Sequence, residues 1–166
     1  MTCAQEILRR GEWNGPAADT VLLDYDGRQR RRIALTGIGG TAFLLDLERV
    51  MGLQDGDALR LTDGSLVQVK AAPEALYEVR CQDRLHLIRV AWHLGNRHLP
   101  TQIEEDRLLI REDRVIAEML NKLSADVTLI EAPFLPEGGA YGLGTTLSHS
   151  HNHSGHHHHE NGHSHG

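Results

Sequence analysis

Hydrophobic and polar positions alternate in short runs through the first 72 residues, a pattern typical of β-strands. Runs at 20–27, 31–37 and 41–47 predict three strands, with Gly27 in the turn between the first two. In residues 56–72 the alternation continues on both sides of Asp63-Gly64, the dipeptide that most strongly indicates a tight hairpin. The first part of the chain is therefore predicted to be a small β-rich domain.

The pattern changes after Pro73, which is expected to mark the junction. Residues 75–81 alternate as a strand, and Asp83 then has the position and chemistry of a helix cap. Apolar residues follow at helical spacing, and Gly95-Asn96 suits a helix end with a left-handed backbone. A helix is predicted between Asp83 and this pair.

Two short strand-like runs, 101–105 and 107–112, precede a second helix within 112–124, whose apolar side chains share one face. Residues 125–134 read as a closing strand. The order β-α-β-β-α-β is that of the ferredoxin-like split βαβ unit. We therefore predict an α+β protein, with a β-rich domain in 1–73 and a ferredoxin-like domain in 74–143.

Residues 144–166 contain no aliphatic side chain except Leu147 and are predicted to form a disordered tail, because they cannot bury enough surface to offset ordering entropy. Nine of the twelve histidines of the chain lie here. Neutral imidazole is a ligand suited to nickel, copper and zinc. A purification tag is the alternative, but interleaved Ser, Asn and Gly favour a native metal-binding tail. Its candidate ligands are His149, His151, His153, His156, His157, His158, His159, His163 and His165.

His98 is the candidate ligand in the folded part, where it follows the predicted helix end. A lone histidine there is most often a capping or hydrogen-bonding residue. One surface imidazole binds metal poorly, but a two-fold axis would present two of them to one ion. His86 and His93 lie seven residues apart on the helix, and we interpret both as solvated or hydrogen-bonded.

Other features of the sequence argue against several classes of protein. The net charge is −6, and the short basic run from Arg28 to Arg32 is interpreted as a solvated strand end, so nucleic acid is a poor candidate partner. No apolar stretch is long enough to span a membrane, and no export signal is recognisable at the start. With two cysteines, these features predict a cytoplasmic protein. Cys81 is interpreted as a small buried residue and Cys3 as part of a frayed terminus.

No catalytic motif is recognisable, so the chain is not expected to be an enzyme. The segment "GIGGTA" (37–42) formally matches a dinucleotide-binding fingerprint, but a strand rather than a helix is predicted after it, so we interpret it as a turn. A hydrolytic metalloenzyme using His98, Glu104 or Glu112 remains as a minor alternative.

Three segments of the chain together resemble the urease accessory protein E family of nickel metallochaperones. They are "VRCQDRLHLIRVAWHLGNRHLPTQIEEDRLLI" (79–110), "PFLPEGGAYG" (133–142) and the His-rich end. The block "HLGNRHLPTQI" and the "EGGAYG" motif are the specific parts. The resemblance covers residues 76–142 well and the first domain only through its β-rich pattern.

The resemblance implies a peptide-binding-like β domain, a ferredoxin-like metal-binding domain and a homodimer in which His98 meets its symmetry mate at a shared nickel site. Nickel would be cargo, passed to apo-urease together with a GTPase and other accessory proteins. Some members carry further histidines where this chain has Glu112 and Arg114, which puts an auxiliary site there in doubt. Copper(II) and zinc(II) are also expected to bind in vitro. The alternative is a metal storage or buffering protein that acts through its tail.

Overall fold

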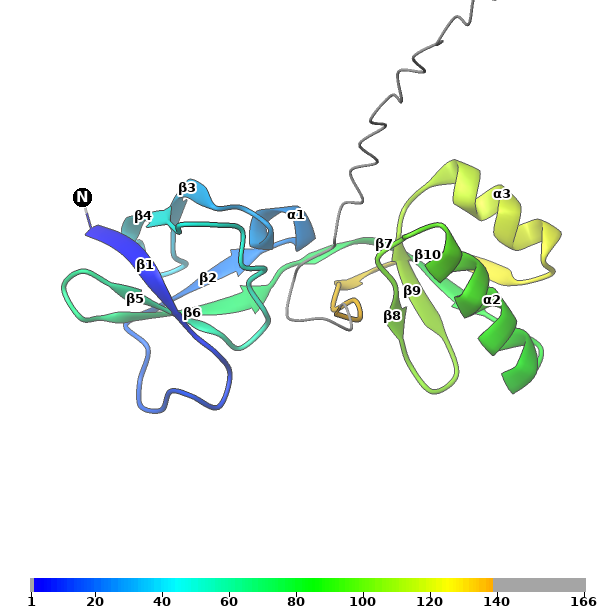
Figure 1. The fold of residues 1–166 in the computed structure, drawn as a ribbon, viewed down its shortest axis with the longest axis horizontal. Coiled ribbons are helices and arrows are strands. Elements are labelled where there is room, and N and C mark those ends of the chain that lie inside the picture. The colour runs from blue at the N-terminus through cyan, green and yellow to red at the C-terminus, as the bar shows by residue number, and fades with distance from the viewer. Residues whose placement is uncertain (1, 139–166) are drawn as a thin grey trace, which may run out of the picture.

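In a computed structural model, which describes residues 2–138, the chain forms two domains, each built on one β-sheet (Figure 1). The first domain contains one short helix, α1 (Tyr25–Arg28). Its strands are β1 (Thr2–Leu8), β2 (Asp19–Leu23), β3 (Arg32–Thr36), β4 (Ala42–Asp46), β5 (Ala58–Leu61) and β6 (Leu66–Ala71). The second domain contains the helices α2 (Arg84–Asn96) and α3 (Arg114–Lys122). Its strands are β7 (Pro73–Arg80), β8 (Gln102–Ile103), β9 (Leu108–Arg111) and β10 (Asp126–Pro133).

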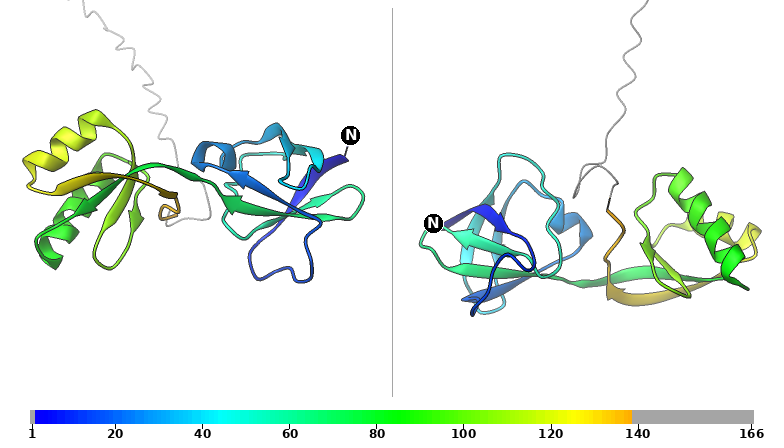
Figure 2. Two further views of the ribbon diagram at one scale, coloured as in Figure 1. Left: turned by 180° about the vertical axis from the view of Figure 1, so that it is seen from behind. Right: turned by 60° about the horizontal axis from the view of Figure 1, so that its bottom comes forward.

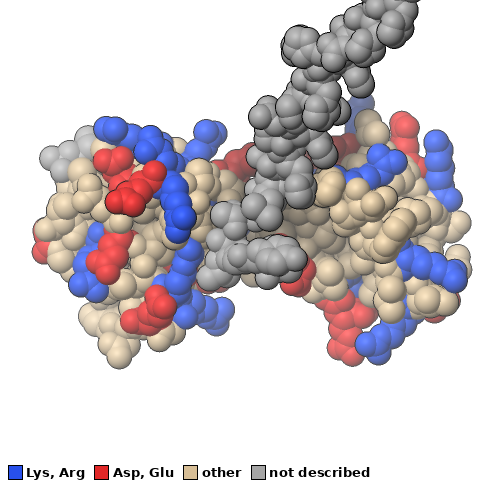
Figure 3. Space-filling model, in the orientation of Figure 1, with Lys and Arg blue, Asp and Glu red and all other residues tan. Residues whose placement is uncertain are grey.

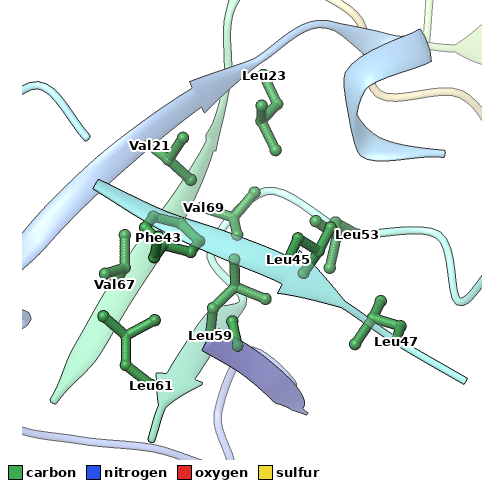
Figure 4. Close-up of a cluster of buried hydrophobic side chains, with 11 residues drawn as sticks. Val21, Leu23, Phe43, Leu45, Leu47, Leu53, Leu59, Leu61, Val67 and Val69 are labelled. Atoms are coloured by element: carbon green, nitrogen blue, oxygen red, sulfur yellow. The ribbon is translucent and has the colours of Figure 1, made fainter. Parts of the chain in front are cut away.

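The first sheet has the strand order β2-β6-β5-β1-β4-β3. Strands β5 and β6 form the hairpin predicted around Asp63-Gly64, where Gly64 has a positive φ of 87°. The core of this domain consists of branched aliphatic side chains around Phe43, contributed by alternate positions of the strands (Figure 4). The period-2 pattern of the sequence therefore places one face of each strand in the core.

The carboxylate of Asp19, at the start of the edge strand β2, links this strand to the loop beside β3 at the opposite edge of the first sheet. It accepts hydrogen bonds from the backbone N–H of Gly39 (2.7 Å) and Thr41 (2.9 Å), in the loop that joins β3 to β4. A Cβ atom on Gly37 would lie 2.3 Å from Asp19 Oδ2, so the close approach requires glycine there. Residues 37–41 therefore form a turn around Asp19. This agrees with the interpretation of "GIGGTA" (37–42) as a turn rather than a dinucleotide-binding motif.

We expect the substitution Asp19→Asn to lower the melting temperature, because its amide cannot replace both acceptor oxygens. The backbone N–H groups of Thr41 and Gly39 lower the pKa of Asp19 to about 2. Since a free aspartate titrates near pH 3.9, the stabilisation is complete above about pH 4 and is lost as the pH falls toward 2. The difference in melting temperature between the two proteins, followed by circular dichroism, should therefore shrink below pH 4. A difference that stays constant down to pH 2 would contradict this role.

The second sheet has the order β10-β7-β9-β8, and all its neighbouring strands are antiparallel. The buried faces of α2 and α3 share one hydrophobic core with β7 and β9, so both helices cover the same face of the sheet. The succession β7-α2-β8-β9-α3-β10 is the order predicted from the sequence. Asp83 caps α2 as expected, since its side chain accepts a hydrogen bond from the N–H of His86 (2.8 Å).

Three expectations for the first domain are wrong. Cys3 is not on a frayed terminus, because it lies in β1 and pairs with Leu44 of β4. The strand expected over 20–27 ends at Leu23, where Asp24 caps the one-turn helix α1 by accepting a hydrogen bond from Gly27 N–H (2.7 Å). Arg28 is not a solvated strand end: it belongs to α1 and is only 2% exposed.

Arg28 is buried because α1, the helix that carries it, lies at the contact between the two domains. The Arg28 guanidinium donates a hydrogen bond to the backbone carbonyl of Phe134, just beyond β10, and burial lowers its pKa. The Tyr25 ring packs on the Phe134 ring with 5.5 Å between centroids. Asp26 Oδ1 lies 2.8 Å from Nη1 of Arg111 at the end of β9. On the other side of the junction only Ala72 separates β6 from β7, which run on from one domain into the other (Figure 2).

The surface carries charges of both signs. On the face shown in Figure 3, Lys and Arg side chains follow one another over part of the first domain, with Asp and Glu side chains beside them. Between residues 2 and 138, none of the helices has the length and apolar character needed to cross a bilayer.

Candidate metal centre

His98 lies at the carboxyl end of α2, in a conformation that histidine rarely adopts. The helix includes Gly95 and Asn96, so the expectation that this pair forms the left-handed end is wrong. The left-handed residue is His98 itself, with φ of 57°. The N–H of His98 donates to Gly95 O (2.9 Å) and the N–H of Leu99 to Leu94 O (3.3 Å), which is the Schellman arrangement. The side chain of His98 is exposed.

The same arrangement ends α3, where Ser124 has φ of 62°. Its N–H donates to Asn121 O, and the next residue, Ala125, donates to Leu120 O. Glycine is the usual residue at this position because a Cβ atom is unfavourable there. Among residues 2–138, His98 and Ser124 are the two non-glycine residues with positive φ. At the end of α2 this position carries an exposed imidazole in place of glycine.

An apolar stripe runs along α2 on the side that faces away from the sheet. At 100° per residue, Leu85, Ile88 and Trp92 fall within about 60° of one another. The buried side chains of α2 lie on the opposite side of the helix. The three stripe residues are exposed, Trp92 by 64%. The helix that carries this stripe ends at the His98 turn, and exposed apolar side chains grouped in this way are typical of contact surfaces.

A hollow of about 250 Å³ lies beside the His98 turn. Leu99 and Pro100, directly after His98, line it together with Glu112 and Asp113, which precede α3. Arg114, the second position where an auxiliary metal site was put in doubt, is exposed at the start of α3. Residues 2–138 contain no group of three or more His, Cys, Asp or Glu side chains that could hold a metal ion. Within residues 2–138, His98 is therefore not part of a metal-binding group of three or more such side chains.

The other two histidines of α2 have structural contacts. The backbone N–H of Gln82 donates to His86 Nδ1 (3.1 Å), so the ring proton is on Nε2, which donates to Leu123 O (2.7 Å). Both ring nitrogens of His86 are thereby occupied, in agreement with its interpretation as a hydrogen-bonded residue. His93 is partly buried, and its ring meets that of Trp92 edge-on at 5.1 Å.

Two further side chains considered from the sequence are poorly placed for metal chemistry. Cys81 packs against the core of the second domain, and burial raises the pKa of its thiol, which disfavours the thiolate that binds metals. Glu104 lies 2.5 Å from Arg107 Nε in an ion pair. The structure does not bring Glu104 and Glu112 together with His98 in a metal-binding group. The nine tail histidines lie outside the described residues.

Sequence reasoning missed the apolar stripe. The signal was present in "RLHLIRVAWHL" (84–94), where apolar residues occupy more than one side of the predicted helix. The helix prediction rested on the apolar residues of the core-facing side alone. The apolar residues on the other side of the helix were left unexplained.

Two family models match adjoining parts of the chain. The model described as the N-terminal domain of the UreE urease accessory protein matches residues 4–72, and that of the C-terminal domain matches residues 74–165. The second match contains both His98 and the histidines of the tail. The chain belongs to the UreE family. The family resemblance inferred from the sequence is thereby confirmed.

Curated UreE proteins from several bacteria are similar over most of the chain. The urease accessory protein UreE of Beijerinckia indica is 53% identical over 154 residues, which cover 93% of this chain and 88% of the relative. The UreE of Rhodopseudomonas palustris strain HaA2 is 57% identical over 141 residues, 85% of this chain and 66% of the relative. The UreE of Ruegeria pomeroyi is 47% identical over 151 residues, 91% of this chain and 99% of the relative. The similarity to UreE proteins therefore extends over both domains.

Proposed function

We propose that this UreE-family chain is a nickel metallochaperone that binds Ni(II) as a homodimer and delivers it to apo-urease. It acts as a cytoplasmic carrier rather than an enzyme, and nickel is its cargo. Its partners in delivery are the urease accessory GTPase and the complex of apo-urease with accessory proteins. The family assignment supports this role, since the similar curated proteins are named as urease accessory proteins.

The observation that carries the proposal is the position of His98. It is an exposed imidazole held in a left-handed conformation, at the end of a helix whose outward face is apolar. We infer that two copies pack through this end of the second domain, with Leu85, Ile88 and Trp92 in the contact, so that two-fold symmetry places one His98 from each copy beside the axis. Two imidazoles at an accessible site make an exchangeable centre, which a carrier needs.

The domain division and the tail belong to the same proposal. We assign residues 1–73 to a β-rich domain and 74–143 to a ferredoxin-like domain, in keeping with the strand order β10-β7-β9-β8. Residues 144–166 then supply additional imidazoles that raise nickel capacity. Copper(II) and zinc(II) are expected to compete in vitro, so selectivity for nickel has to come from supply and partners.

Urease activity in cells that lack this protein tests the proposed function. Activity should be low at trace nickel and should recover when nickel is added in excess, because mass action then replaces delivery. Restoring the full-length chain should restore activity at trace nickel. Full urease activity without the protein at trace nickel would contradict the proposal.

A metal store is the second candidate, favoured by the nine histidines in the last 18 residues. Deleting residues 144–166 separates the two functions. The number of nickel ions bound per dimer should fall, while folding and dimerisation should survive, since these residues offer little apolar surface to bury. Equilibrium dialysis gives the nickel count and sedimentation gives the mass. An unchanged nickel count, or monomers, would contradict this division between tail and folded part.

A further inference from the structure

A groove separates strands β1 and β4 of the first domain. The two strands are parallel and pair over Thr2–Ala4 and Phe43–Leu45, so the second half of β1 has no pairing with β4. Beyond Ala4 they diverge, and a hollow of about 450 Å³ opens between them. The groove belongs to a region of the molecule that the proposed nickel site does not use.

A β-bulge explains why the strands diverge. The register between β1 and β5 shifts between Ala4 and Glu6, so Gln5 is an extra residue on β1. A bulge bends its strand and increases the local twist, which here turns β1 away from β4. As a result, β1 beyond Ala4 faces the hollow opposite residues 46–49, at the end of β4 and in the loop that follows it, with no strand pairing between the two segments among residues 2–138.

The groove combines an open strand edge with an apolar floor. Ile7, Leu47 and Met51 line it, and Ile7 and Met51 also pack against the core of the first domain. Gln5 and Glu48 line it as well and are exposed. The open edge of β1 beside apolar side chains is suited to an added strand, which forms main-chain hydrogen bonds and places alternate side chains on the floor.

The chain itself contains a segment with the matching pattern. Residues 141–147 read Tyr-Gly-Leu-Gly-Thr-Thr-Leu, so Tyr141, Leu143, Thr145 and Leu147 fall on one face of an extended strand. We propose that residues 141–147 dock as an added strand in the groove between β1 and β4 of the same chain. The apolar face of this segment then covers Ile7, Leu47 and Met51.

The segment begins close enough to reach the groove. Leu135 and Arg9 line one hollow of about 360 Å³, and Arg9 also lines the groove. Tyr141 follows Leu135 by six residues, which span up to about 20 Å when extended. Docking within one chain also benefits from an effective concentration on the order of millimolar. This short tether favours the chain's own segment over a second copy.

Docking gives the first domain a task that the proposed nickel delivery does not assign to it. His149 follows Leu147 by two residues. The histidines of the tail would therefore leave the fold from one fixed place on the first domain. The docking itself requires no nickel and stands independently of delivery to urease.

Amide hydrogen exchange on the full-length, metal-free protein tests the proposal. In the wild-type chain, the amides of residues 5–8 that face the groove should exchange at least about tenfold more slowly than in a variant with Leu143→Asp and Leu147→Asp. Both substitutions put a carboxylate on the face that meets the apolar floor. The matched control, Thr146→Asp with Ser148→Asp, adds the same charge on the opposite face and should keep the protection.

Three results would overturn the proposal. The groove amides could exchange equally fast in wild type and in the Leu143→Asp, Leu147→Asp variant. The control could lose protection to the same extent, which would remove the role of the apolar face. Protection that increases with protein concentration would identify a second copy as the occupant. Slow exchange that is independent of concentration and lost only in the Leu143→Asp, Leu147→Asp variant supports docking within the chain.

Discussion

The substitution His98→Gly is expected to abolish the nickel site of the folded part while leaving the protein at least as stable. Because the proposed dimer has two-fold symmetry, this one substitution removes two imidazoles from one nickel site. Loss of an outer-shell partner alone costs about 10- to 100-fold in metal affinity, so the loss of both ligands should exceed about 100-fold. Glycine relieves the left-handed backbone of residue 98 (φ 57°) and should raise the free energy of unfolding by up to about 1 kcal/mol. Competition with a chelating dye, on a chain without residues 144–166, measures the affinity.

The end of α3 supplies a matched control. Ser124 occupies the same position of the same helix-end arrangement, with φ of 62°. The substitution Ser124→Gly should therefore give a similar gain in stability and no change in nickel affinity. Alanine is the less informative choice at residue 98, because its Cβ atom keeps the backbone strain. Normal nickel affinity in the His98→Gly variant would show that this histidine is only a helix-end residue.

The substitution Trp92→Glu is expected to separate the dimer into monomers. Trp92 is the largest side chain of the apolar stripe on α2, and a buried tryptophan at the centre of an interface is typically worth 2 kcal/mol or more. The dimer dissociation constant should therefore rise at least about 30-fold. Nickel affinity should fall with it, since each monomer keeps one His98. Sedimentation velocity over a range of concentrations measures both the mass and the dissociation constant.

Ile38 provides the control for Trp92. It is 71% exposed, at the tip of the β3–β4 hairpin in the first domain. The substitution Ile38→Glu removes a comparably exposed apolar side chain and should leave the dimer intact. A Trp92→Glu protein that still sediments as a dimer would show that the stripe is not the contact between copies.

The elements that the sequence predicted well have strong local signals. Asp63-Gly64 determines a hairpin through backbone conformation alone, and Asp83 caps α2 through a bond to a residue three positions ahead. The order β-α-β-β-α-β follows from the change of hydrophobic period along the chain. In each case the information lies within a few neighbouring residues.

The features that the sequence did not predict depend on distant partners. Arg28 resembles the neighbouring arginines in the sequence, whereas in the structure its guanidinium is buried against the Phe134 carbonyl, 106 residues later. The left-handed residue was assigned to Gly95-Asn96 by propensity, whereas the structure extends α2 and places His98 there. The packing of Leu94 and Leu99 into the core of the second domain accompanies that extension. Tertiary packing decided where the helix ends.

The contact between α1 and Phe134 also determines the order of events during synthesis. All the strands of the first sheet have left the ribosome once residue 71 is out, but the acceptor of Arg28 is made 106 residues after Arg28 itself. At a synthesis rate of 5 to 20 residues per second, roughly 5 to 20 s pass between the synthesis of Arg28 and that of Phe134. During that interval water has to solvate the charge that the finished protein buries. The nascent first domain therefore folds with Arg28 exposed, and the two domains join only when the last strand emerges.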